Sequence, residues 1–113
     1  MTVPPQASPA HAHLRAAGTS VVLDLVSADQ PIIVHWGRDL GPLSDVELAD
    51  LARAAAPQRV AGGLDATARL TVLPQASGGW LTTPGLLGDR DGDDFSTRLR
   101  LTAATLTPTS ADI

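Results

Sequence analysis

The sequence predicts a mainly β chain with one short α-helix and one long loop. Several short segments alternate apolar and polar residues and carry β-branched side chains, which is typical of half-buried strands. A serine and a glutamate at capping-box spacing precede a helical pattern. Residues 80–96, W-L-T-T-P-G-L-L-G-D-R-D-G-D-D-F-S, hold too much glycine and proline for a helix or a regular strand.

Composition narrows the classes of protein to consider. The 113 residues suffice for one domain, and 43% hydrophobic with 18% charged residues is typical of a globular chain. The net charge of −4 lacks the basic patch that nucleic-acid binding requires, so that class is excluded. Without cysteine there is neither a disulfide framework nor a thiolate metal site. Aromatic residues make up only 3%, so Trp36 and Trp80 stand out.

The N-terminal region, residues 1–18, is expected to be a flexible lead-in to a domain over 19–113. Residues 1–13 are rich in proline and small polar residues, and they lack the basic and apolar regions of a signal peptide. No apolar run is long enough to cross a bilayer, so we expect a cytoplasmic protein without membrane contact. His11 and His13 form an H-x-H pair that could bind a metal, but no third ligand is evident, so no metal site is predicted.

Two strands follow and make a predicted hairpin. Residues 19–26 alternate, with Asp24 on one face and three apolar side chains on the other: Val21, Leu23 and Leu25. The sequence Asp29-Gln30-Pro31 supplies a turn, and residues 32–36 form the second strand, which ends at Gly37. His35 lies at the end of that strand, where a structural histidine is commoner than a ligand.

One helix is predicted over about residues 45–56. Ser44 and Glu47 match a capping box, in which each side chain satisfies an unpaired backbone amide of the first turn. Apolar residues follow at helical spacing, and Pro57 ends the pattern.

Two further strands are predicted after the helix and a loop over residues 58–65. Residues 68–73 alternate up to Pro74, and residues 98–103 alternate again, with an extension towards Leu106. Four strands and one helix make a thin core, and the last strand lacks a partner. An unpaired edge strand is an aggregation hazard, so the chain is expected to be part of something larger.

The acidic loop is the candidate binding site. It carries Asp89, Asp91, Asp93 and Asp94, whose carboxylates repel one another and must be solvated, pair with Arg90, or meet a ligand. An aromatic side chain such as Trp80 beside hydrogen-bond acceptors is the chemistry that holds a sugar ring. A solvated Asp/Gly turn remains the commoner alternative.

Two other chemistries fit this loop less well. An EF-hand would take Asp89, Asp91 and Asp93 as its first ligands, but Asp94 stands where it needs glycine and Arg100 where it needs glutamate. A glycosidase acid/base pair needs carboxylates on opposite sides of the scissile bond, whereas these lie on one turn. Catalysis by this chain alone is therefore not expected.

Two stretches carry a family resemblance: P-I-I-V-H-W-G-R-D-L-G-P-L (31–43) and L-P-Q-A-S-G-G-W-L-T-T-P-G-L-L-G-D-R-D-G-D-D-F-S (73–96). From about residue 21 to 106 the chain resembles the N-terminal domain of actinobacterial α-galactosidases of glycoside hydrolase family thirty-six. The resemblance implies part of an antiparallel β-sandwich (a supersandwich) with one short α-helix, incomplete here. A catalytic (β/α)-barrel and a C-terminal β-domain would follow it.

The resemblance also implies a role for the loop. Both catalytic aspartates of the family lie in the barrel, so this chain has no catalytic residue, and no cofactor is implied. The N-terminal domain of the family helps to assemble a homo-oligomer, and its loop reaches a neighbouring subunit's sugar pocket. By motif, that substrate-binding role falls on Asp91, with Arg90 and Trp80 as further candidates. Departures from the family pattern are Asp93, where relatives have a basic residue, and Thr97, where they have proline.

The first hypothesis is therefore the non-catalytic N-terminal portion of an enzyme that hydrolyses terminal α-D-galactosides with retention. The alternative is a stand-alone carbohydrate-binding or assembly module without catalysis. The reading frame downstream of the Ile113 codon distinguishes the two.

Overall fold

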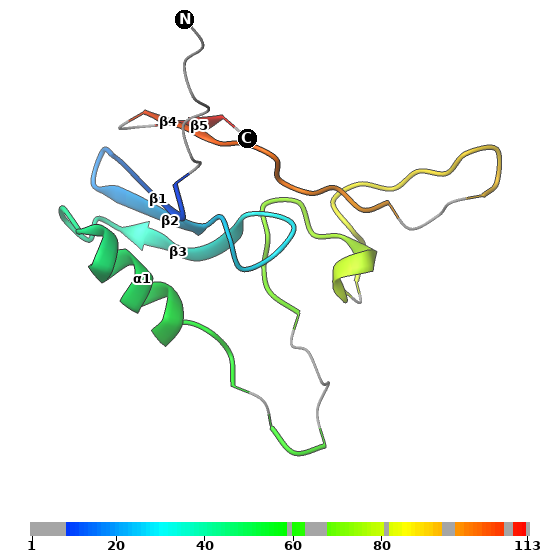
Figure 1. Cartoon of the computed structure of the whole chain (residues 1–113), viewed down its shortest axis with the longest axis horizontal. Helices are drawn as coiled ribbons and strands as arrows, with labels where there is room; N and C mark the ends of the chain where they lie inside the picture. Colours follow the sequence, from blue (N-terminus) through cyan, green and yellow to red (C-terminus); the bar gives the residue numbers. More distant parts are fainter. Residues whose placement is uncertain are drawn as a thin grey trace, which may run out of the picture.

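The structure is a computed structural model and describes residues 9–58, 60–62, 68–80, 82–93, 97–107 and 110–112. A three-stranded antiparallel sheet in the order β1-β2-β3 lies at its centre, formed by β1 (His11–Ala16), β2 (Thr19–Asp24) and β3 (Ile32–Arg38). The helix α1 (Asp45–Ala54) lies on one side of this sheet, and the ribbon of β4 (Thr105–Thr107) and β5 (Ser110–Asp112) on the other (Figure 1). The prediction of a mainly β chain with one short α-helix is confirmed.

The first strand corrects the expectation that residues 1–18 are a flexible lead-in. Residues 11–16 form β1, which pairs along its whole length with β2, from His11 opposite Asp24 to Ala16 opposite Thr19. The two strands are joined by Ala17 and Gly18, both at positive φ (50° and 76°), as a tight hairpin turn of this kind requires. The H-A-H-L-R-A pattern of β1 is only weakly apolar, so its partner specifies the strand more than its own sequence does. Residues 1–8 lie outside the described residues.

The predicted hairpin of β2 and β3 is confirmed, but β2 is buried on both faces. On one face, Leu23 and Leu25 form a core cluster with Ala12, against which the chain after residue 100 packs through Leu101, Ala104 and Leu106. The opposite face was expected to be polar and half-exposed. Instead Ser20, Val22 and Asp24 are buried.

The buried carboxylate of Asp24 is satisfied locally. Its Oδ1 accepts from the backbone N–H groups of Val26 and Ser27, at 3.0 and 3.1 Å. Burial alone would raise the pKa of Asp24, but these hydrogen bonds and the Ser27 hydroxyl lower it overall. Asp24 therefore ends the strand and begins the turn.

The helix begins as predicted. Ser44 Oγ accepts from the N–H of Glu47 at 3.2 Å, and Glu47 Oε1 accepts from the N–H of Ser44 at 3.4 Å, which completes the capping box. The helix ends at Ala54, two residues before the predicted end. Leu48 and Ala52 are its buried side chains, and α1 contacts β1. Within the described ranges, no helix has the length and apolar content to cross a bilayer.

The two later strands are not formed as predicted. Residues 68–73 make only one bridge to β3, between Thr71 and Ile32. The backbone of Leu99 bonds to the side chain of Gln75, and the N–H of Leu101 donates to the carbonyl of Asp29, so residues 98–103 pair with turns and side chains rather than with a strand. Regular pairing starts only at Thr105, in β4. Alternation along a chain predicts an extended segment but does not supply a partner for it.

Candidate functional site

The acidic loop ends in a well-formed turn. Arg90 and Asp93 exchange two backbone hydrogen bonds, at 2.7 and 2.9 Å, around Asp91 and Gly92. Asp91 has φ 51° and Gly92 has φ 87°, and positive φ at both central residues is the requirement of a type I′ hairpin turn. Asp-Gly is among the preferred sequences for this turn, so the local sequence determines the conformation of the tip.

The aspartates of the tip have different roles. Asp89 Oδ1 accepts from the N–H of Gly92 at 2.8 Å and so supports the turn. Asp91 and Arg90 are exposed, and among the described residues the carboxylate of Asp91 accepts no hydrogen bond. Asp94 lies outside the described residues. Asp93 is also exposed, and among the described residues its carboxylate likewise accepts no hydrogen bond. Asp91 and Asp93 are therefore the carboxylates of the described tip that the fold leaves available to a ligand or a partner.

Trp80 lies elsewhere on the loop. It follows the 3-10 helix η1 (Ala76–Gly78), is half-buried, and donates from Nε1 to the carbonyl of Thr83 at 3.2 Å. Figure 1 shows the hairpin tip projecting away from η1 and from the sheet. Arg90 and Asp91 are thus together on the tip, while Trp80 belongs to the base of the loop.

A close approach at Gly85 fixes one limb of the loop. Its N–H donates to the carbonyl of Pro74 at 2.8 Å. A Cβ at this position would lie 2.7 Å from Leu73 Cδ1 and 3.3 Å from Pro74 Cδ, closer than side chains normally approach. Glycine in the P-G pair of the loop therefore lets the backbone lie against the side chains of Leu73 and Pro74.

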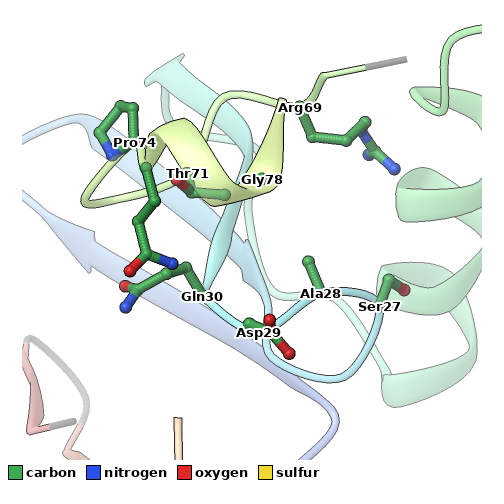
Figure 2. A pocket seen from close by; sticks show the side chains of 9 residues that line it. Ser27, Ala28, Asp29, Gln30, Arg69, Thr71, Pro74 and Gly78 are labelled. Atoms are coloured by element: carbon green, nitrogen blue, oxygen red, sulfur yellow. The ribbon is translucent and has the colours of Figure 1, made fainter. Parts of the chain in front are cut away.

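A small pocket lies at the base of the loop and is shown in Figure 2. Its volume is about 200 Å³, and it is lined by Ser27, Ala28, Asp29, Gln30, Arg69, Thr71, Pro74, Gln75 and Gly78. The guanidinium of Arg69 lies apart from Asp29 in this view. Asp29 is already paired with Arg98, whose hydrogen bond lowers the pKa of the carboxyl, and with Arg100 at 3.3 Å. The pocket is smaller than the roughly 300–1,000 Å³ of ordinary ligand sites, so it fits a structural role better.

Besides the acidic tip, a second cluster of polar side chains forms through hydrogen bonds that the sequence analysis did not predict. Arg15 donates from Nε and Nη2 to the two carboxylate oxygens of Asp39, at 2.8 and 2.9 Å. Ser20 Oγ donates to Asp39 at 3.0 Å, lies 2.9 Å from His13 Nε2, and accepts from the N–H of Leu40. The hydrogen bond from Arg15 is the main reason that the pKa of Asp39 lies well below its ordinary value.

This cluster contains a Ser, a His and an Asp but is not arranged for nucleophilic catalysis. The one hydroxyl proton of Ser20 goes to Asp39, so His13 must donate to the hydroxyl instead of accepting from it. Burial, followed by the charge of Arg15, lowers the pKa of His13 and favours its neutral form. Ser20 is also fully buried, whereas a nucleophile must reach its substrate. The cluster joins the β1–β2 hairpin to the loop after β3.

The residues considered as metal ligands do not gather. His13 bonds to Ser20, and His35 Nε2 lies 3.1 Å from the carbonyl of Arg38. In the part of the chain that the structure describes, no three His, Cys, Asp or Glu side chains are placed to hold a metal ion.

A sequence model described as the glycosyl hydrolase family 36 N-terminal domain matches residues 29–112. The chain belongs to this family. No curated protein and no solved structure matched the chain. The family description makes it a non-catalytic N-terminal portion of a glycoside hydrolase.

The structure gives physical reasons for two short segments within the matched range. The H-W-G segment is the end of β3, and the aspartate that follows it, Asp39, is the acceptor at the centre of the second cluster. The D-G pair forms the type I′ turn. The sequence analysis missed Asp39 and Gln75, because their partners are distant in sequence and no local pattern marks them.

Proposed function

We propose that this chain is the N-terminal domain of an α-galactosidase that hydrolyses terminal α-D-galactosides with retention. In this proposal the domain assembles the oligomer and lends its acidic hairpin to a neighbouring subunit's sugar pocket. The observation that carries the proposal is Asp91: an exposed carboxylate without a partner among the described residues, on a pre-formed turn of a family 36 domain. The cytoplasmic location expected from the sequence is part of the proposal, and fractionation of the source cells tests it.

The chemistry of the tip suits a sugar. An ionised carboxylate accepts hydrogen bonds from two hydroxyl groups at once, and charge-assisted bonds of this kind are stronger than neutral ones. Arg90, its neighbour on the exposed tip, can donate to the same ring. Trp80 stays in the proposal as an apolar surface, although it would have to act from the base of the loop.

Exposed apolar side chains support the view that the domain is completed by further structure. They lie on β3, on α1 and in the loops, and include Trp36, Val46, Val60 and Leu87. The barrel and neighbouring subunits are the proposed cover for this surface.

Two measurements test the proposal. The purified chain should not hydrolyse an aryl α-galactoside. A longer protein, whose reading frame continues past the Ile113 codon into a barrel, should hydrolyse it with retention. Turnover by the chain alone, surviving repurification, would contradict the non-catalytic role. An in-frame stop at that point, in a clean assembly, would contradict the α-galactosidase.

One observation favours the alternative of a stand-alone carbohydrate-binding module. The side chain of Trp36 is 71% exposed at the end of β3, and an exposed indole can stack on a sugar. Galactoside titration of the chain, followed by tryptophan fluorescence, would then saturate and would be lost in Trp36→Ala. We expect no such saturation, because the proposed sugar contact needs a second subunit.

A further inference from the structure

The acidic loop has an outgoing limb, which follows Pro74, and a returning limb, which includes residues 97–99. The side chain of Gln75 joins the two limbs at their base. Gln75 Oε1 accepts from the N–H of Leu99 at 2.5 Å, and Gln75 Nε2 donates to the carbonyl of Leu99 at 3.0 Å. A neighbouring strand would offer the same donor and acceptor with its peptide groups. The side-chain amide thus takes the place of a partner strand, which residues 98–103 lack among the described residues.

Other contacts meet at the same place. Gln30 Nε2 donates to the same carbonyl of Leu99 at 3.1 Å, so that this oxygen accepts two hydrogen bonds. Ser77 Oγ donates to the carbonyl of Thr97 at 3.2 Å. Both limbs of the loop therefore converge on residues 75–77, and Gln75 makes the contact that holds the returning limb by both of its backbone groups.

The ion pairs beside this contact depend on ionic strength, whereas the Gln75 contact does not. Arg98 and Arg100 pair with Asp29, but their side chains are 60% and 68% exposed. Exposed ion pairs contribute little and are screened by salt. The neutral amide contact of Gln75 is not screened in this way, so the position of the returning limb should depend on Gln75 at high ionic strength as well.

The tip has its own internal hydrogen bonds, between Arg90 and Asp93 and between Asp89 and Gly92. Its conformation is therefore set locally, and its place relative to the sheet is set at the base. We propose that Gln75 is a positioning residue: its contact with Leu99 fixes where the loop presents Asp91 to the sugar. This inference rests on the proposed function of Asp91.

The experiment is a double-mutant cycle of Gln75→Ala and Asp91→Gly in the full-length enzyme, with kcat/KM on an aryl α-galactoside as the readout. Glycine at 91 keeps the positive φ of the turn and removes only the side chain. We expect Gln75→Ala to lower kcat/KM about three- to tenfold in the parent enzyme and to have almost no effect once Asp91 is absent. Hydrogen exchange at the Leu99 amide should become about tenfold faster in Gln75→Ala, because its acceptor is gone.

The control is Gln58→Ala, an exposed glutamine outside the loop, which should change neither quantity. If Gln75→Ala aggregates, Gln75→Glu keeps the acceptor for the Leu99 amide, loses the donor, and takes its place in the cycle. Equal losses of kcat/KM with and without Asp91 would show a merely structural role and overturn the inference. Normal kinetics in Gln75→Ala, with impaired Asp91→Gly, would overturn the inference alone. Normal kinetics in Asp91→Gly would overturn the proposed function as well.

Discussion

Substitution of Asp91 separates its two roles, since this residue both holds a backbone conformation and presents a carboxylate. Its φ of 51° costs an L-residue with a Cβ about 1–2 kcal/mol, less for Asp and Asn, and almost nothing for Gly. Asp91→Gly therefore keeps the turn without a side chain, Asp91→Asn keeps the turn and one acceptor oxygen, and Asp91→Ala loses the carboxylate and strains the turn.

If the carboxylate binds sugar hydroxyls, all three variants lose activity. Leaving hydroxyl groups unpaired in a desolvated pocket costs about 1–3 kcal/mol, which is roughly five- to 150-fold in kcat/KM. We expect the loss of kcat/KM in Asp91→Gly and Asp91→Ala to lie in that range. Asp91→Asn should lose less, because it keeps one acceptor oxygen. Asp45→Ala, in the first turn of α1, is the control and should keep the parent kinetics.

The assay is kcat/KM on an aryl α-galactoside, with oligomer mass measured on the same samples. If Asp91 serves only to hold the turn, Asp91→Gly keeps the parent kinetics. Asp91→Ala then loses stability or oligomeric assembly before it loses activity. Parent kinetics in an intact Asp91→Gly oligomer would refute the sugar contact.

Three further predictions concern stability and assembly. Ser44→Ala removes the N-cap of α1 and should destabilise the chain by about 1 kcal/mol, seen as a lower thermal midpoint; an unchanged midpoint would mean that the cap contributes nothing. Because the folded pKa of Asp39 lies below its unfolded value of about 3.9, the ionised carboxylate stabilises the fold above that pH, and the contribution is lost as pH falls further. The urea midpoint of the parent chain should therefore drop between pH 5 and pH 2, and that of Asp39→Asn should drop by less. Equal drops in the two proteins would contradict this stabilising role of Asp39. Because apolar side chains such as Trp36, Val46 and Leu87 are exposed, the isolated chain should self-associate. A concentration-independent monomer in gel filtration, with a sharp transition in thermal scans, would count against a missing partner.

The parts of the fold that the sequence predicts are those determined within a few residues. The β2–β3 hairpin follows from alternation and a turn, and α1 follows from the Ser44–Glu47 capping box. Strand β1 was missed because one of its faces carries a single large apolar side chain, Leu14, between two alanines, and because its pairing depends on β2. Residues 98–103 alternate as a strand does, but the groups that bond to Leu99 and Leu101 are a side chain and a turn.

The candidate site divides in the same way. The Asp91–Gly92 turn has a local cause and lies in the stretch that the sequence identifies as a loop. The contact between Gln75 and Leu99 spans 24 positions, and glutamine has no pattern that announces such a bond. The separation of Trp80 from the tip depends on how far the hairpin projects, which neither segment encodes alone.

The place of β1 and β2 bears on how a piece of this protein should be produced. The family match starts at residue 29, but β2 is the middle strand of the sheet and lies entirely before that point. A gene product begun at residue 29 would lose the strand that pairs with β3 along its length, together with Arg15, the main partner of Asp39. The side chain of Ile32, now 1% exposed, would lose its cross-strand neighbour Asp24. Expression from residue 29 should therefore give inclusion bodies, whereas a start at residue 9 keeps all three strands.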